Sequence, residues 1–72
     1  MNTWCVYIIP KAGRYYTGIT TDLYNRLSQH GVKKALYVEN GLTRDQAVKR
    51  EKEIKVWTRK KKESLINESR LG

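Results

Sequence analysis

The chain has 72 residues and a formal net charge of +8, from 15 Lys+Arg against 7 Asp+Glu. A chain of this length can bury only one small core, so we expect a single domain over residues 1–72. The charge is uneven, because residues 1–31 hold three basic and one acidic residue and residues 32–72 hold twelve and six. Such an excess favours a polyanionic partner such as nucleic acid, although it also serves solubility.

The single cysteine, Cys5, excludes an internal disulfide and a site built from several thiolates. It lies in the apolar run 4–9, where we expect it to be buried. That run is too short to cross a bilayer, which needs about 20 apolar residues. The N-terminus also lacks the basic start and the cleavage site of a signal peptide. We therefore expect a soluble, cytoplasmic protein with no membrane partner.

Residues 4–9 and 14–18 are rich in branched and aromatic side chains, which predicts two strands. The segment 10–13 between them contains Pro and Gly and predicts the turn of a hairpin. Alternation along the first strand predicts two faces, with Cys5, Tyr7 and Ile9 on one and Trp4, Val6 and Ile8 on the other. Tyr15 and Tyr16 must likewise point to opposite faces.

A helix is expected over residues 22–30, capped by Thr20 or Thr21 and ended by Gly31. At 100° per residue, leucines 23 and 27 form its buried stripe. Arg26 and His30 are four residues apart, so they are neighbours at the edge of that stripe.

Residues 35–39 predict a third strand that ends at the turn signal Asn40–Gly41. Residues 43–46 fit a capping box, which opens a second helix running to about Trp57. A third, short helix follows from Thr58 through residue 66. The order β-β-α-β-α-α predicts an α+β fold with a small, mainly antiparallel three-stranded sheet flanked by helices.

An acid occupies an unexpected position on the second helix. In helical projection Glu51 falls near the middle of the apolar arc that runs from Trp57 through Ala47 to Val48, whereas Glu53 falls among lysines. A carboxylate facing a core is costly unless it is paired, hydrogen-bonded or bound to a metal. Glu51 could pair with an arginine such as Arg26, ligate a hard cation, or be exposed by a rotation of the helix.

Several short motifs, in this order and spacing, resemble the GIY-YIG nuclease superfamily, and above all its small stand-alone bacterial proteins. The residues that carry the resemblance are Val6-Tyr7-Ile8, Tyr16-Thr17-Gly18, Arg26, His30 and Glu51, and the likeness covers about residues 4–67. The connection 31–34 is shorter than the family's usual one. Asn67 is the only candidate for a late asparagine found in several relatives.

The resemblance implies that Tyr7 or Tyr16 helps to activate the attacking water, directly or through a second group. It implies that Arg26 stabilises charge on the scissile phosphate and that Glu51 ligates one divalent cation, probably Mg²⁺. His30 would hydrogen-bond a tyrosine or the phosphate, or only complement the helix dipole. A tyrosine is a poor base near neutral pH, and we expect Arg26, His30 and the metal to ease formation of its phenolate.

The leading hypothesis is therefore a metal-dependent endonuclease that acts on nucleic acid, DNA rather than RNA. The alternatives are a nucleic-acid-binding module of the same fold without activity, and a basic domain that binds an acidic protein. Basic residues of the second and third helices would contact the phosphate backbone without selecting a sequence. They are Lys49, Lys52, Lys55, Arg59, Lys60, Lys61 and Lys62.

Overall fold

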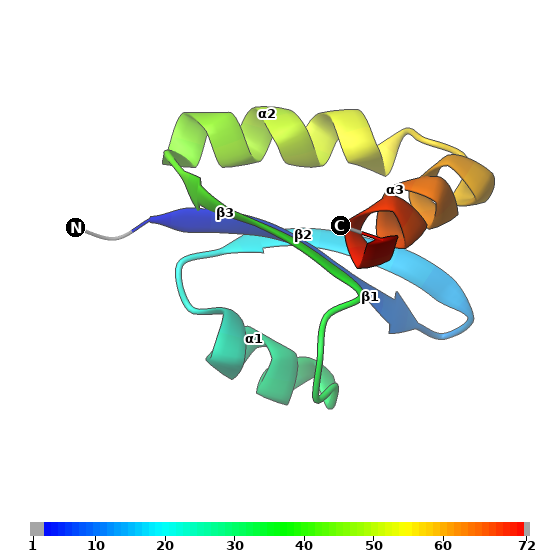
Figure 1. Ribbon diagram of the computed structural model, residues 1–72. Coiled ribbons are helices and arrows are strands. Elements are labelled where there is room, and N and C mark those ends of the chain that lie inside the picture. The colour runs from blue at the N-terminus through cyan, green and yellow to red at the C-terminus, as the bar shows by residue number, and fades with distance from the viewer. Residues whose placement is uncertain (1–2, 72) are drawn as a thin grey trace.

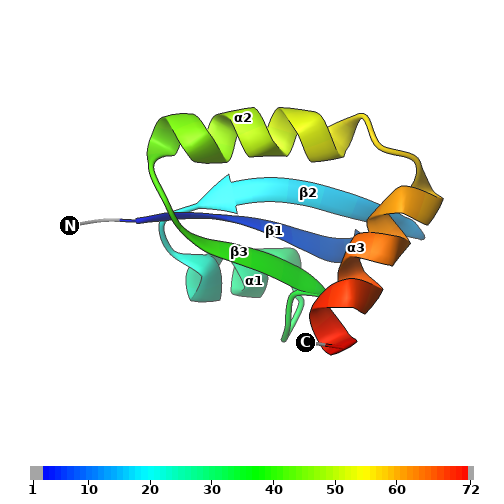
Figure 2. The same ribbon diagram turned by 45° about the horizontal axis from the view of Figure 1, so that its top comes forward.

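The computed structural model describes residues 3–71 of the chain, and the side chains of residues 3–69. An antiparallel sheet of three strands in the order β2-β1-β3 forms the middle of the molecule (Figures 1 and 2). The elements in chain order are β1 (Trp4–Lys11), β2 (Arg14–Thr20), α1 (Leu23–His30), β3 (Tyr37–Leu42), α2 (Arg44–Lys55) and α3 (Arg59–Leu71). The predicted α+β fold and its element order are confirmed.

The hairpin of β1 and β2 is tighter than expected. The turn consists of Ala12 and Gly13 alone, both with positive φ (51° and 77°), and the strands pair as far as Lys11 and Arg14. Two successive residues with positive φ fit the right-handed twist of the strands that they join. Pro10 and Lys11 therefore belong to the strand, and the predicted turn over residues 10–13 is too long.

The predicted bounds of the third strand are wrong at both ends. β3 begins at Tyr37 and continues through Asn40 and Gly41 to Leu42, which pairs with Trp4. The register shifts between Trp4 and Val6, and Gly41 has a φ of 73°. A bulge of this kind absorbs a residue with positive φ and lets pairing resume, so the Asn-Gly signal bends the strand without ending it.

The ends of α1 follow from short-range hydrogen bonds. The N-cap is Asp22, whose side chain accepts from the backbone N–H of Asn25, and neither Thr20 nor Thr21 holds that place. The hydroxyl of Thr20 instead accepts from the N–H of Asp22 and fixes the entry to the helix. Gly31 ends α1 in the left-handed conformation, as predicted.

The other two helices differ from expectation only at their ends. Thr43 and Gln46 form the predicted capping box of α2, which stops at Lys55 and so leaves Trp57 beyond it. The hydroxyl of Thr58 accepts from the N–H of Lys61 at the start of α3, which is longer than the short helix expected.

Helices cover both faces of the sheet. α2 lies over one face, α1 lies over the other, and α3 packs at the hairpin end of the sheet on the α2 side (Figures 1 and 2). The predicted alternation of β1 holds, because Val6 and Ile8 join the core on the α2 side, whereas Tyr7 and Ile9 pack with Leu27 of α1. No helix of the described part is long and apolar enough to cross a membrane.

Candidate active site

The buried phenol of Tyr7 is the centre of the site. Its side chain is 1% exposed, and its Cα partner in the hairpin is Gly18 of β2. A Cβ at position 18 would lie 2.5 Å from the Tyr7 hydroxyl oxygen and 2.6 Å from its Cζ. Because β2 is an edge strand, only a glycine here lets the Tyr7 ring lie across the strand toward the border of the sheet.

The rings of Tyr16 on β2 and His30 on α1 lie beside this phenol, so three rings from three elements form a cluster. The ring centroids of Tyr7 and Tyr16 are 6.3 Å apart, those of Tyr7 and His30 are also 6.3 Å apart, and those of Tyr16 and His30 are 5.1 Å apart. Tyr16 is 39% exposed and His30 is half-buried, so the cluster has one sealed and two accessible members. The structure thus brings together three of the five predicted catalytic residues by direct contact.

A short chain of hydrogen bonds orients the imidazole. The Lys11 ammonium lies 3.4 Å from Nδ1 of His30, and Nε2 of His30 lies 3.4 Å from the Tyr7 hydroxyl oxygen. An ammonium can only donate, so Nδ1 accepts and the proton of the neutral ring is on Nε2. His30 then donates to the Tyr7 oxygen, which leaves the Tyr7 O–H free to donate elsewhere.

Lys11 was not anticipated from the sequence. Besides its contact with His30, its ammonium lies over the Tyr16 ring, 5.2 Å from the centroid. The alternation of β1 would have placed Lys11 on the same face as Tyr7, had the strand not been expected to end at Ile9.

Burial keeps the Tyr7 phenol protonated by raising its pKa. It raises the pKa of the Tyr7 phenol to about 12, with smaller increases from Tyr16, Cys5 and Glu51 and a decrease from Arg26. Arg26 lowers the pKa of Tyr7, as expected, but desolvation outweighs it, and the expected effect of a metal stays a prediction. Tyr7 is a hydrogen-bond donor at neutral pH.

Arg26 and Glu51 approach the phenol from opposite layers. Arg26 is exposed on α1, Glu51 is half-buried on α2, and both lie close enough for their charges to act on the pKa of Tyr7. Among the described residues Glu51 forms no ion pair or hydrogen bond, so the pairing with Arg26 that the sequence left open does not form.

The donor set suits a hard cation with few protein ligands. No group of three or more His, Cys, Asp or Glu within residues 3–69 could hold a metal, so Glu51 does not belong to a cage of protein ligands. Mg²⁺ is commonly bound by one or two carboxylates and completes its shell with water and substrate phosphate. A half-buried carboxylate without a partner fits that pattern.

The predicted nucleic-acid-binding residues have different surroundings on α2 and α3. Lys49, Lys52, Lys55 and Lys60 are exposed on α2 and α3. Lys61 lies over the Trp57 ring, 4.4 Å from its centroid. Arg59 and Lys62 instead line a hollow beside the hairpin. Asn67 is exposed on α3, in a different layer from the tyrosine cluster.

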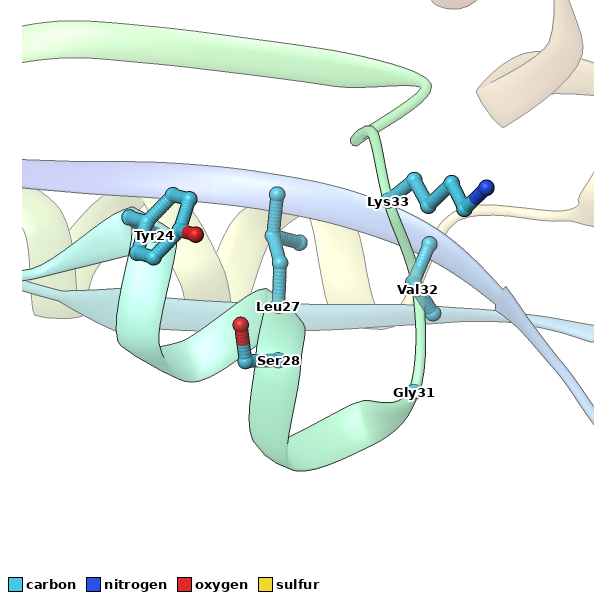
Figure 3. A pocket seen from close by; sticks show the side chains of 6 residues that line it. All are labelled: Tyr24, Leu27, Ser28, Gly31, Val32 and Lys33. Atoms are coloured by element: carbon cyan, nitrogen blue, oxygen red, sulfur yellow. The ribbon is translucent and has the colours of Figure 1, made fainter.

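A second hollow, of about 350 Å³, lies on the other flank of α1 (Figure 3). Leu27 and Val32 form its apolar floor, and Tyr24, which is 82% exposed, stands at its border. Tyr24 therefore does not pack in the core. On α1 the leucine stripe lies between this hollow and the side that carries Arg26 and His30. The hollow is therefore distinct from the tyrosine cluster.

The domain is small and basic, and two tyrosines and a histidine meet at one place in it, with an arginine and an unpaired carboxylate whose charges act on the buried phenol. These are the kinds of residue that a nuclease-type catalytic domain uses. The model of the GIY-YIG catalytic domain matches residues 3–36, which include the first four of these residues but not Glu51. No solved structure gave a significant match.

Small proteins of the UPF0213 group resemble almost the whole chain. UPF0213 protein SSP2268 of Staphylococcus saprophyticus is 36% identical over 81 residues, covering 94% of this chain and 99% of that protein. UPF0213 protein YhbQ of Escherichia coli is 37% identical over 82 residues, covering 96% and 82%. UPF0213 protein SA0446 of Staphylococcus aureus is 37% identical over 81 residues, covering 94% and 99%. The chain belongs to the family of small UPF0213 proteins, and its residues 3–36 match the GIY-YIG catalytic domain.

Proposed function

We propose that this protein is a divalent-cation-dependent endonuclease that hydrolyses phosphodiester bonds of nucleic acid, with DNA the expected substrate. The observation that carries the proposal is the contact between Tyr7, Tyr16 and His30, together with an unpaired Glu51 whose charge acts on the Tyr7 phenol. The net charge of +8 and the family of the chain support a polyanionic substrate.

The chain's own groups divide the work by their burial. Tyr7, held protonated, donates its O–H to the attacking water or to a phosphate oxygen, and the N–H of His30 fixes the position of the phenol. Tyr16 is exposed on the same face, where it can contact the incoming water directly. Tyr16 is therefore the better candidate for helping to activate the water.

Opposite charges flank the reacting phosphate in this proposal. Arg26 donates to its oxygens and stabilises the negative charge that develops in the transition state. Glu51 would hold the cation, which supplies Lewis-acid stabilisation of the phosphate and of the leaving oxygen. Because Glu51 has no protein partner, binding the cation breaks no ion pair within the described residues.

The test is nicking of supercoiled plasmid with Mg²⁺, comparing Glu51→Gln with Glu68→Gln. Glu68 is an exposed carboxylate of α3, so the control makes the same chemical change elsewhere. Loss of one electrostatic partner of the transition state should slow cleavage by about 10²–10³-fold in Glu51→Gln, whereas Glu68→Gln should cut like the wild type.

One outcome would reject the enzyme, and another would reject the role of Glu51. A wild type that cuts neither DNA nor RNA with Mg²⁺ or Mn²⁺ would leave a binding module of this fold, provided that its DNA affinity falls steeply with salt. Equal cleavage by Glu51→Gln and the wild type would show that the carboxylate is not part of the reaction.

A further inference from the structure

A basic hollow lies where the β1–β2 hairpin meets the start of α3. Its volume is about 310 Å³, and Arg14, Tyr15, Arg59 and Lys62 line it. The views in Figures 1 and 2 agree in placing the hairpin end beside the first turns of α3. The two elements are tied together by a hydrogen bond from Nη1 of Arg59 to the carbonyl of Gly13, at 3.0 Å.

The guanidinium of Arg59 is held in one orientation. Besides its bond to Gly13, it donates from Nε to Glu63 at 3.4 Å, and its Cζ lies 5.0 Å from the centroid of the Tyr15 ring. No hydrogen bond within the described residues uses Nη2. A planar guanidinium fixed in this way, with free N–H groups, is well suited to a phosphate, because little side-chain entropy remains to be lost.

The other charges of the hollow also favour an anion. Arg14 is exposed and forms no ion pair among residues 3–69, and Lys62 is half-buried with its ammonium 3.5 Å from the carbonyl of Tyr15. One acid is nearby, since Glu63 accepts from both Tyr15 and Arg59. Three cations less this carboxylate give a local charge of +2.

The hollow is joined to the tyrosine cluster through the tip of the hairpin. Arg14 is the Cα partner of Lys11, and the Lys11 ammonium lies over the Tyr16 ring. Of these two paired cations, Lys11 therefore lies at the tyrosine cluster and Arg14 lies at the hollow. A polyanion that passes the hairpin tip from the tyrosine cluster to the hollow therefore meets positive charge at Lys11 and at Arg14.

We propose that this hollow binds a backbone phosphate of the same nucleic acid whose scissile phosphate lies at the tyrosine cluster. The inference rests on the proposed nuclease function and adds the path that the substrate takes across the protein. Contacts of this kind position the strand without selecting its sequence.

The test is binding of a fluorescein-labelled duplex DNA to the wild type, Arg14→Gln and Arg44→Gln in chelator, over a series of salt concentrations. Arg14 and Arg44 are both exposed, both changes remove one guanidinium, and only Arg14 lines the hollow. Loss of one phosphate contact should reduce the slope of log K against log salt by about 0.9, which is roughly an eightfold loss of affinity near 0.1 M salt. Arg44→Gln should keep the slope of the wild type.

An equal slope for Arg14→Gln and Arg44→Gln overturns the proposal, and a hollow that takes only free phosphate would give that result. Binding in chelator is measured without cleavage, so the two proposals fail separately. A wild type that nicks plasmid while Arg14→Gln binds like Arg44→Gln retains the nuclease and loses the hollow. A slope difference without any nicking does the reverse.

Discussion

Replacing Gly18 with alanine tests the packing on which the site depends. Gly18 lies in the middle of β2, and its φ is not in the left-handed region, so alanine fits its backbone without strain. The added Cβ, however, would lie 2.5 Å and 2.6 Å from two atoms of Tyr7 and 3.0 Å from Cε1 of Tyr16. Carbon atoms in contact are normally about 3.5–4.0 Å apart, so the Tyr7 ring must move by about 1 Å.

The free energy has two opposing parts. Overpacking of a buried site costs about 1–3 kcal/mol, and Tyr7 has no solvent-filled space to enter because it is 1% exposed. Replacing glycine in a strand recovers about 0.5–1 kcal/mol of backbone entropy. The net expectation is a loss of about 1–2 kcal/mol, or roughly 6–12 °C in Tm for a domain of this size. A shift of about 1 Å in Tyr7 should also lower kcat by about 10²-fold.

Urea denaturation and plasmid nicking measure the two effects, and the double variant Tyr7→Leu/Gly18→Ala provides the control. With the phenol removed, alanine at position 18 should stabilise the protein relative to Tyr7→Leu alone, because only the entropic gain remains. The reasoning is refuted if Gly18→Ala alone is more stable than the wild type and equally active. In that case the ring would not lie across the strand at this position.

Three further predictions use other contacts. Lys11→Met should leave stability unchanged and slow cleavage about tenfold. It should also shift the ¹⁵N signals of His30 from the Nε2–H tautomer toward a mixture of tautomers, because the ammonium no longer donates to Nδ1. Unchanged signals would contradict the assigned tautomer. The pKa of Tyr7 is about 12 when folded against 10.0 unfolded, so its contribution is present below pH 10 and is lost as pH rises from 10 to 12. The free energy of unfolding should therefore fall between about pH 8 and pH 11 in both proteins, by about 1.4 kcal/mol less in Tyr7→Phe than in the wild type. Equal falls would show that burial does not keep Tyr7 protonated. Thr17→Val should raise the free energy of unfolding by about 1 kcal/mol, because the Thr17 hydroxyl is buried without a partner among the described residues; a fall would mean that the hydroxyl has a partner such as a bound water.

The elements of the fold follow from local patterns, whereas several of their ends follow from pairing between distant residues. Alternation in β1 predicted which side chains face α1, and the capping box at Thr43 predicted where α2 begins. The Asn-Gly signal at residues 40–41 predicted an end that does not occur, because Leu42 pairs with Trp4 across the sheet. Such pairing is invisible in a window of a few residues.

The candidate site shows the same division. The family resemblance implied that His30 could hydrogen-bond a tyrosine, and the 3.4 Å between its Nε2 and the Tyr7 hydroxyl oxygen agrees with it. Lys11 was missed because the hairpin turn is shorter than its Pro and Gly suggest. The surroundings of Glu51 depend on how α2 crosses the sheet. The sequence therefore left open whether Glu51 pairs with an arginine, ligates a cation or is exposed.

Tyr7 belongs both to the core and to the site, which ties stability to chemistry in this small domain. It packs with Ile9 and Leu27, and the same burial raises its pKa to about 12 and keeps it a donor. A buried donor has one fixed position, whereas the more accessible Tyr16 and His30 can adjust to a substrate. Tyr7 therefore sets the reference point from which the phosphate, the water and the cation would be placed. A loss of packing around this ring should impair cleavage before it unfolds the protein, since about 1 Å of misplacement costs far more in rate than in stability.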